Sequence, residues 1–346
     1  MLRRHQNIGV SIKTDIKKYE DELTELETEL MKETLKLPNK THPDVPIGDE
    51  SKSRVMFVRG TKPNIDKENG DHLSLGEKHD LFDFENGGKI TGSKFVFLKN
   101  HAALLELALV NWAIKKGIQK GFTPILTPDV WRTEVLEGCG FQPRDESSQT
   151  YHIEEKNINL SLIGTSEAPL AGMHASELLY QKDLPRKYIA FSHWFRKEAG
   201  KGATSKGLYR LHQFSKVEMF IYWEPEHSEK YFQEIVDIQW ELLDELGFHY
   251  RGLDMASFEL GASAFRKVDL EWWLPSKNDF GEVTSASNWT NYQSRRFNIQ
   301  YLRGENEKHL VHTLNGTAVA TPRIIMAILE TYGMKIPDAL KNHFIQ

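Results

Sequence analysis

One segment constrains this 346-residue chain more than any other: Phe195–Phe220, FRKEAGKGATSKGLYRLHQFSKVEMF. Arg196 and Glu198 stand two residues apart, so a β-strand would direct both side chains to one face. Residues 199–215 then contain glycines and cations but no acidic residue. The returning limb alternates residues able to bind a ligand: Arg210, His212, Phe214, Lys216 and Glu218. The pattern predicts an antiparallel hairpin with a cationic tip.

Such a hairpin has the side chains that a nucleotide needs. Arg196 can pair with a phosphate, Glu198 can accept a hydrogen bond from an exocyclic amine, and Phe214 can stack on a base. The alternative is a solvated hairpin whose side chains form ordinary cross-strand pairs. The segment by itself leaves both interpretations open.

Composition excludes several other classes of protein. Apolar residues make up 39% and charged residues 27%, which is typical of a soluble globular chain with one large domain. The single cysteine, Cys139, excludes a disulfide framework and a multi-cysteine zinc site. The net charge of −5 argues against indiscriminate nucleic-acid binding but allows a local basic surface. No apolar run is long enough to span a bilayer, so we expect no membrane partner.

The amino-terminal region predicts a helix with a narrow apolar seam. Apolar residues recur there in steps of three and four, as in a coiled-coil heptad: Ile16, Tyr19, Leu23, Leu26 and Leu30. Such a seam needs a partner helix, so either a second subunit covers it or a preceding helix is absent from this sequence. The first fourteen residues are basic and lack acids, which fits a transit peptide as well as the start of this helix.

The rest of the chain predicts an α+β fold with a mostly antiparallel sheet flanked by helices. Residues 121–128 contain two prolines and are expected to form an edge strand. The other expected strands are 158–164, 188–196, 208–222, 249–255, 267–274 and 281–285, and the expected helices are 102–116, 168–182, 227–246 and 318–332. We expect three parts: a partial coiled-coil helix (1–38), a loop-rich connector (39–94) and a main domain (95–346).

Further polar stretches interrupt the apolar pattern. Thr165-Ser166-Glu167 can bind a ligand or simply cap a helix. Carboxylates and hydroxyls at Asp269-Leu270-Glu271 and Glu282–Ser285 suit a hydrated divalent cation with phosphates, or two exposed strands. Asn315-Gly316-Thr317 leads into an apolar helix, where Arg323 must meet a partner or an anion.

In this order, the segments resemble the class II aminoacyl-tRNA synthetases, and within them the seryl-tRNA synthetases. Gly121–Pro128 resembles motif 1, Phe195–Glu218 resembles motif 2 in its seryl form, and Thr313–Arg323 resembles motif 3. Thr165-x-Glu167 is similar to the family's serine-binding Thr-x-Glu. The resemblance covers essentially everything from Leu37 onward. Residues 37–46 and 280–288 are most similar to the mitochondrial members.

The resemblance implies a class II synthetase fold and a homodimer in the mitochondrial matrix, with the cytoplasm as the alternative location. Residues 1–38 would be the remnant of a shortened helical arm that binds tRNA. The implied enzyme activates L-serine with ATP to seryl-adenylate and transfers it to the 3′-terminal ribose of tRNA(Ser), with Mg²⁺ as cofactor. The hairpin tip, KGATSK, departs from the Arg-Asp-Thr-Arg usual in bacterial members.

The resemblance also assigns roles to individual residues. The implied catalytic residues are Arg196, Glu282 and Arg323. The implied serine-binding residues are Thr165, Ser166, Glu167, Arg196, Glu218 and Thr317. The implied ATP-binding residues are Arg196, Lys197, Glu198, Leu211, Phe214, Glu282, Val283, Thr284, Ser285 and Arg323, with Mg²⁺ held by Glu282 and Ser285.

Two other functions remain open at this point. A non-catalytic paralogue with a binding or regulatory role would keep the fold without the reaction. An amino-acid:carrier-protein ligase on the same fold would activate an amino acid without charging tRNA.

Overall fold

The computed structural model describes residues 2–63, 71–141, 150–155, 158–197 and 207–345. The chain forms two compact units, Met1–Pro38 and Asn39–Gln346. The first unit is a long helix, α1 (Leu2–Leu35), as the heptad pattern predicts. Its seam residues from Ile12 to Leu30 are exposed. Among the described residues, no helix is both long and apolar enough to cross a membrane.

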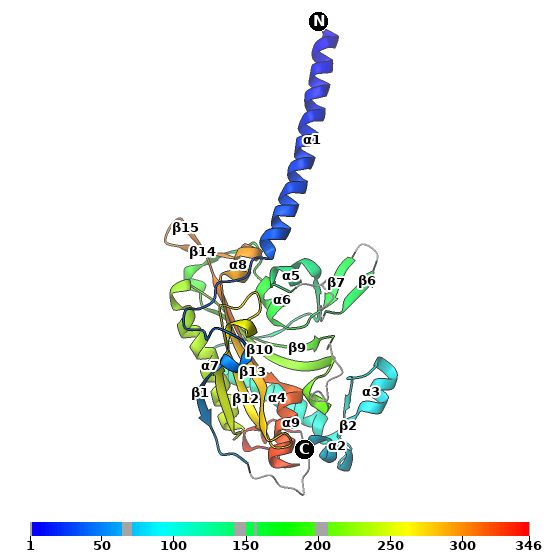
Figure 1. Cartoon of the computed structure of the whole chain (residues 1–346), viewed down its shortest axis with the longest axis vertical. Coiled ribbons are helices and arrows are strands. Elements are labelled where there is room, and N and C mark those ends of the chain that lie inside the picture. The colour runs from blue at the N-terminus through cyan, green and yellow to red at the C-terminus, as the bar shows by residue number, and fades with distance from the viewer. Residues whose placement is uncertain (1, 64–70, 142–149, 156–157, 198–206, 346) are drawn as a thin grey trace. The chain divides into compact units, whose positions relative to one another are not determined.

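The second unit contains an eight-stranded sheet in the order β1-β11-β12-β13-β16-β10-β9-β4, which Figure 1 shows beside the helices that cover it. Every neighbouring pair is antiparallel except β4 with β9, which is parallel. The predicted mostly antiparallel α+β fold is therefore confirmed. The bounds are β1 (Arg54–Arg59), β4 (Thr123–Leu126), β9 (Arg186–Phe195), β10 (Gln213–Trp223), β11 (Tyr250–Asp254), β12 (Arg266–Leu274), β13 (Asp279–Thr290) and β16 (His312–Ala320).

Three helices pack on one face of this sheet: α4 (Asn100–Gln119), α7 (Ser228–Glu245) and α9 (Thr321–Tyr332). Strand alternation explains the two faces, because successive side chains of a strand point in opposite directions. On β10, Val217 and Met219 join the apolar core beneath the helices, whereas Lys216 and Glu218 point to the opposite face. A Cβ at Gly316 would lie 2.2 Å from Ile235 Cγ2, so glycine lets α7 approach β16 closely.

Smaller elements surround the main sheet. They form the sheets β15-β14-β8, β5-β7-β6 and β2-β3. Their bounds are β2 (Phe82–Asp83), β3 (Phe97–Leu98), β5 (Val130–Arg132), β6 (His152–Glu155), β7 (Ile158–Leu162), β8 (Leu178–Tyr180), β14 (Gln300–Arg303) and β15 (Glu307–Leu310). The short helices are α2 (His72–Lys78), α3 (Phe84–Thr91), α5 (Thr133–Gly138), α6 (Glu167–Gly172) and α8 (Tyr292–Phe297). Single 3₁₀ turns are η1 (Glu50–Lys52), η2 (Gln181–Asp183), η4 (Gly207–Tyr209), η5 (Pro225–His227), η6 (Ser257–Glu259) and η7 (Asp338–Leu340).

Several elements differ from the sequence prediction. The strand predicted over 208–222 begins only at Gln213, because residues 207–209 form the turn η4. The helix predicted over 168–182 ends with α6, because β8 pairs with the distant strand β14 instead of continuing it. Residues 39–94, predicted to be a connector, lie in the second unit, where β1 pairs with β11. The predicted helix over 318–332 begins only at Thr321, because the preceding residues complete β16.

Candidate active site

The candidate site is a cleft where the ends of β9 and β10 meet β13, β16 and the first turn of α9. Its lining includes Arg196, Phe214, Lys216, Glu282, Thr317 and Arg323. The strands of the predicted hairpin are present. β9 and β10 pair along their length, from Phe195 opposite Gln213 to Arg186 opposite Tyr222. Lys216 and Glu218 are almost fully buried, so the alternative of a solvated hairpin does not hold for these positions. The hairpin tip and Glu198 lie outside the described residues.

Two buried carboxylates stand close together at one end of the site, and one amide joins them. Glu167 and Glu218 are 6% and 1% exposed. Asn315 Nδ2 donates to Glu167 Oε2 at 3.0 Å and to Glu218 Oε1 at 2.8 Å. Trp289 Nε1 donates to Asn315 Oδ1 at 3.0 Å, which orients the amide. A neutral donor therefore separates two groups that would otherwise repel each other.

The two carboxylates differ in their other partners. Lys216 Nζ lies 2.9 Å from Glu218 Oε2, so Glu218 has an ion pair. Gln293 Nε2 donates to Glu167 Oε1 at 2.7 Å. Burial, followed by the nearby Glu218 charge, raises the pKa of Glu167 to about 8 despite Lys216 and Gln293. Burial lowers the pKa of Lys216, partly offset by Glu218.

Hydroxyl groups border the same carboxylates. Thr165 Oγ1 accepts the backbone N–H of Glu167 at 3.1 Å, which fixes the first turn of α6. Thr317 Oγ1 donates to Glu218 Oε2 at 3.4 Å, because the two residues are direct cross-strand partners on β16 and β10. Ser166 Oγ is buried without a hydrogen-bond partner among the described residues. Thr165, Ser166, Glu167 and Glu218 thus gather beside the cleft, next to Thr317, which lines it.

Arg323 lies at the other end of the cleft. Arg323 Nη1, at the first turn of α9, donates to Glu282 O at 2.9 Å and lies 3.3 Å from Glu282 Oε2. The Arg323 guanidinium carbon also lies 4.9 Å from the Tyr209 ring centroid. Burial raises the pKa of Glu282, but Arg323 and then Lys267 outweigh it and hold the pKa at about 2. Glu282 therefore carries its charge throughout the physiological range, and its side chain is still 41% exposed.

Arg196 lies between the two ends. Its Nε donates to Gly164 O at 3.2 Å, which ties the end of β9 to the segment before α6. Its guanidinium carbon is 5.0 Å from the Trp194 ring centroid and 6.0 Å from that of Phe214. The Arg196 charge also favours the ionised form of Glu167, so this cation lies near both the buried carboxyl groups and the Phe214 ring.

Comparison with known proteins places the chain in a family. A model of the tRNA synthetase class II core domain (G, H, P, S and T) matches residues 151–332. The serine–tRNA ligase of Treponema denticola is 45% identical over 341 residues, covering 96% of this chain and 80% of the relative. That of Rhodopirellula baltica is 48% identical over 328 residues, covering 91% and 76%. This chain belongs to the seryl-tRNA synthetases.

Solved structures of seryl-tRNA synthetases share the fold. The Pyrococcus horikoshii enzyme, crystallised with ATP, aligns with a TM-score of 0.86 at 38% identity, covering 94% of this chain and 78% of its own. The cytoplasmic enzyme of Naegleria fowleri, in complex with AMP, aligns with a TM-score of 0.86 at 31% identity, covering 95% and 79%. The predicted class II synthetase fold is therefore confirmed.

The remaining residues predicted from the seryl-tRNA synthetase resemblance are placed as follows. Leu211 and Ser285 line the cleft. Val283 also reaches the lining, but its side chain packs into the core under the helices. Thr284 Oγ1 donates to Thr317 O at 2.5 Å, so its hydroxyl joins β13 to β16. Lys197 is exposed, with its Nζ 5.5 Å from the Tyr151 ring centroid.

The residues predicted to hold Mg²⁺ fit that ion. Glu282 and Ser285 line the same cleft and offer a carboxylate and a hydroxyl. Mg²⁺ is usually bound by one or two carboxylates together with substrate phosphates, so a dedicated protein cage is not required. In the described part of the chain, no group of three or more His, Cys, Asp or Glu side chains is placed to share a metal.

The structure adds residues that sequence reasoning did not assign to the site. Gln239, on α7, donates from Nε2 to Thr284 Oγ1 at 2.8 Å, Ser285 O at 2.8 Å and Thr317 O at 2.9 Å. Gln293, on α8, holds Glu167. Gln239 lies 46 residues from Ser285 in the sequence, and Gln293 lies 126 residues from Glu167. No local pattern marks either amide.

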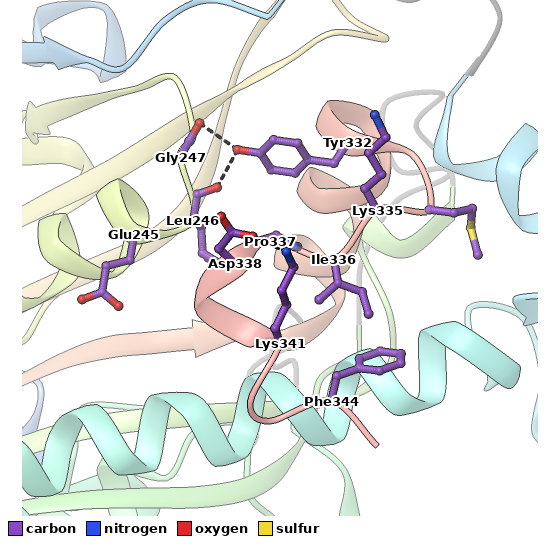
Figure 2. Close-up of a pocket in the computed structure, with 11 residues that line it drawn as sticks. Glu245, Leu246, Gly247, Tyr332, Lys335, Ile336, Pro337, Asp338, Lys341 and Phe344 are labelled. Atoms are coloured by element: carbon purple, nitrogen blue, oxygen red, sulfur yellow. Dashed lines mark hydrogen bonds and ion pairs between the residues drawn. The ribbon is translucent and has the colours of Figure 1, made fainter. Parts of the chain in front are cut away.

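A larger pocket lies elsewhere in the unit, near the carboxyl terminus (Figure 2). We call this cavity of about 780 Å³ the C-terminal pocket; it is lined by residues 245–247, 332, 334–338, 341 and 344. The Tyr332 hydroxyl donates to Leu246 O at 2.7 Å and to Gly247 O at 3.0 Å. Lys341 Nζ pairs with Asp338 Oδ1 at 2.6 Å. None of the residues predicted for the active site lines it.

Proposed function

We propose that this chain is a serine–tRNA ligase, which activates L-serine with ATP to seryl-adenylate and then transfers serine to the 3′-terminal ribose of tRNA(Ser). One observation carries the proposal beyond family membership. The cations Arg196 and Arg323 line one cleft. Lys216 and Thr317, which also line it, contact Glu218 in the buried Glu167–Glu218 pair directly beside the cleft. These groups complement the ammonium of an amino acid and the phosphates of ATP.

Serine activation requires placement and charge neutralisation. The carboxylate of serine is already a nucleophile, so its attack on the α-phosphate needs no general base. Arg196 would bridge the serine carboxylate and the α-phosphate, and Arg323 would hold the γ-phosphate. Arg196 lies beside the Trp194 ring, and Arg323 lies beside the Tyr209 ring and the Glu282 carboxylate, so both cations are already held at the cleft. Phe214 would stack on adenine, with the backbone of Leu211 beside it.

Selectivity for serine follows from the buried end of the cleft. Glu218 and Thr317 are 1% and 2% exposed and would meet the substrate hydroxyl. Alanine would leave these polar groups unpaired in a buried place, which can cost several powers of ten in kcat/KM. Threonine must be excluded by steric fit.

Mg²⁺ belongs to the same proposal. Bound to the ATP phosphates, it would supply additional positive charge where negative charge develops. Glu282 would hold it because its carboxylate stays ionised and partly accessible, and Ser285 would add a hydroxyl oxygen.

An ATP–pyrophosphate exchange assay tests the activation step. We expect exchange that depends on serine and is absent with alanine, followed by aminoacylation of tRNA(Ser). No exchange would favour the non-catalytic paralogue. Exchange without tRNA charging would favour the amino-acid:carrier-protein ligase.

We propose a homodimer as the working form. β4 is the last strand of the sheet, so one of its edges has no strand partner among the described residues. Leu126 on this strand is 77% exposed, and an exposed apolar edge invites pairing with another chain. Sedimentation equilibrium should give twice the monomer mass, and Leu126→Lys should shift the protein to monomer. A monomeric wild type would contradict the proposal.

We propose that α1 takes part in tRNA handling, as the family resemblance implies. Its apolar seam is exposed, whereas the activation site lies wholly in the second unit. Replacing Leu23 and Leu26 by Glu should therefore reduce tRNA charging and leave serine-dependent exchange unchanged. Equal loss of both activities would contradict this role.

A mitochondrial location, and membership of the mitochondrial type of seryl-tRNA synthetase, stay predictions. They rest on the resemblance of residues 37–46 and 280–288 to mitochondrial members. Imaging of the full chain with a carboxyl-terminal fluorescent tag tests the location, and a diffuse cytoplasmic signal would contradict it.

A further inference from the structure

We propose that Gln293 is a positioning residue for the amino acid: it holds the Glu167 carboxylate, through a neutral amide, in the pose that receives the substrate's ammonium group. This inference rests on the proposed function and deepens it. Gln293 itself does not touch the substrate; it acts through Glu167.

The geometry around Gln293 leaves its amide one orientation. Gln293 is fully buried on α8. Its Nε2 donates to Glu167 Oε1 at 2.7 Å, and its Oε1 accepts from Thr313 Oγ1 at 2.7 Å. Once Glu167 is ionised, a flipped amide would set its carbonyl oxygen against the carboxylate and lose both bonds. Thr313 therefore acts as an orienting group behind Gln293.

The charges of the network explain why an amide occupies this position. Both oxygens of Glu167 accept from neutral amides, Oε1 from Gln293 and Oε2 from Asn315. The ion pairs of the described residues include none to Glu167, since Lys216 pairs with Glu218 instead. Glu167 is thus held in place without a cation partner among the described residues, and its pKa of about 8 favours the protonated form until a cation arrives. The ammonium of the amino acid can then supply the missing positive charge in a buried site, where such a pair is strong.

The competing interpretation is that Gln293 is only a satisfied core amide of α8. Both interpretations predict some loss of stability when Gln293 changes. They differ in kinetics, because a packing defect does not distinguish between serine and ATP. The KM values of the two substrates and the pH profile for serine therefore decide between them.

The test compares wild type, Gln293→Met and Gln233→Met in the exchange assay. Methionine keeps the volume and removes the donor. We expect Gln293→Met to raise KM for serine roughly 10- to 100-fold, as for a lost hydrogen bond to a charged group, with KM for ATP unchanged. Gln233 is the matched control, because its Nε2 donates to Asp237 Oδ1 at 2.8 Å on the exposed side of α7. Gln233→Met should change neither KM.

A second variant, Gln293→Glu, adds a readout that packing alone would not move. Two facing carboxyl groups share a proton, so the pH midpoint of kcat/KM for serine should rise by roughly one unit or more. The charged or titratable groups around Glu167 are Glu218 and Lys216 on β10, Arg196 after β9 and Cys139 after α5. All of them stay unchanged in this variant, so the shift reports the new carboxyl group.

The outcomes separate the two proposals. An active wild type in which Gln293→Met raises both KM values equally, or neither, overturns the role of Gln293 and leaves the proposed function intact. A wild type without serine-dependent exchange overturns the proposed function and this inference with it. If Gln293→Met does not fold, Thr313→Val serves the same comparison, with an expected rise in serine KM of about 3- to 10-fold for the lost orienting bond.

Discussion

The cleft and the C-terminal pocket differ in what their polar groups bind. In the C-terminal pocket, the Tyr332 hydroxyl is occupied by the carbonyls of Leu246 and Gly247 (Figure 2). Beside the cleft, the buried Glu167 and Glu218 are joined by the Asn315 amide, Lys216 pairs with Glu218 alone, and the pKa of Glu167 is raised to about 8. Burying charge is costly unless something compensates for it. The difference shows that a buried carboxyl group whose ionised form lacks a cation partner, rather than cavity size, marks the candidate reactive site.

The largest expected effect comes from removing a cation from the cleft. Arg323→Met should lower serine-dependent exchange by at least roughly 10³-fold, because the γ-phosphate loses its charge clamp. Stability should change little, since Arg323's partner, Glu282, is 41% exposed and can be solvated. Arg303→Met is the control, because Arg303 forms an exposed ion pair with Glu226 and should leave exchange unchanged. Exchange above one tenth of wild type in Arg323→Met would contradict the assignment.

Removing a carboxylate from the same cleft should act on one substrate. Glu167→Gln keeps the shape but loses the charge that receives the ammonium. We expect KM for serine to rise roughly 100-fold, as when one partner of a buried charge pair is removed, with KM for ATP unchanged. Initial-rate kinetics with each substrate varied in turn measure both values. A parallel rise in KM for ATP would show that Glu167 supports the whole cleft instead.

The pH dependence of stability tests the same carboxylate without substrate. The pKa of Glu167 rises from 4.5 to about 8 on folding, so between these values the folded chain holds a proton that the unfolded chain has lost. The free energy of unfolding should therefore decrease as pH rises through this window, by up to about 1.4 kcal/mol per pH unit. Urea unfolding at pH 6 and pH 8 measures it. Glu167→Gln should lack this contribution, and equal slopes in both proteins would contradict the raised pKa.

The smallest effect is expected in the C-terminal pocket. Tyr332→Phe loses hydrogen bonds to two backbone carbonyls and should lower the free energy of unfolding by about 1 kcal/mol. Serine-dependent exchange should equal that of wild type. Chemical denaturation and the exchange assay measure the two quantities. A selective change in exchange would mean that the pocket takes part in the reaction, and the contrast between the two cavities would fail.

Local patterns predicted much of this molecule. The alternation of Phe214, Lys216 and Glu218 predicted one face of β10, and the two prolines near residue 124 predicted the edge strand β4. The heptad steps predicted α1. In each case the information lies within a few neighbouring residues, and the periodicity of the element repeats in the sequence.

Contacts between distant segments were not predictable in the same way. The segment over 168–182 has a helical pattern, but β8 forms there because its partner β14 lies more than 100 residues later. Gln293 and Glu167 are 126 residues apart, so neither residue's surroundings in the sequence reveal their hydrogen bond. The resemblance to seryl-tRNA synthetases supplied the residues that would touch substrates. The amides that hold those residues became visible only in three dimensions.

Gln239 has a consequence for how the two substrates are aligned, and therefore for the rate of the reaction. One amide nitrogen on α7 binds three acceptors on β13 and β16, next to the residues expected to meet ATP and serine. Through these bonds α7 holds β13 and β16 in register, and these strands carry the residues expected to contact ATP and serine. A substitution at Gln239 would still allow each substrate to bind. The serine carboxylate and the ATP α-phosphate, however, would no longer be aligned for attack. Such a variant would keep its KM values for both substrates but would have a lower kcat.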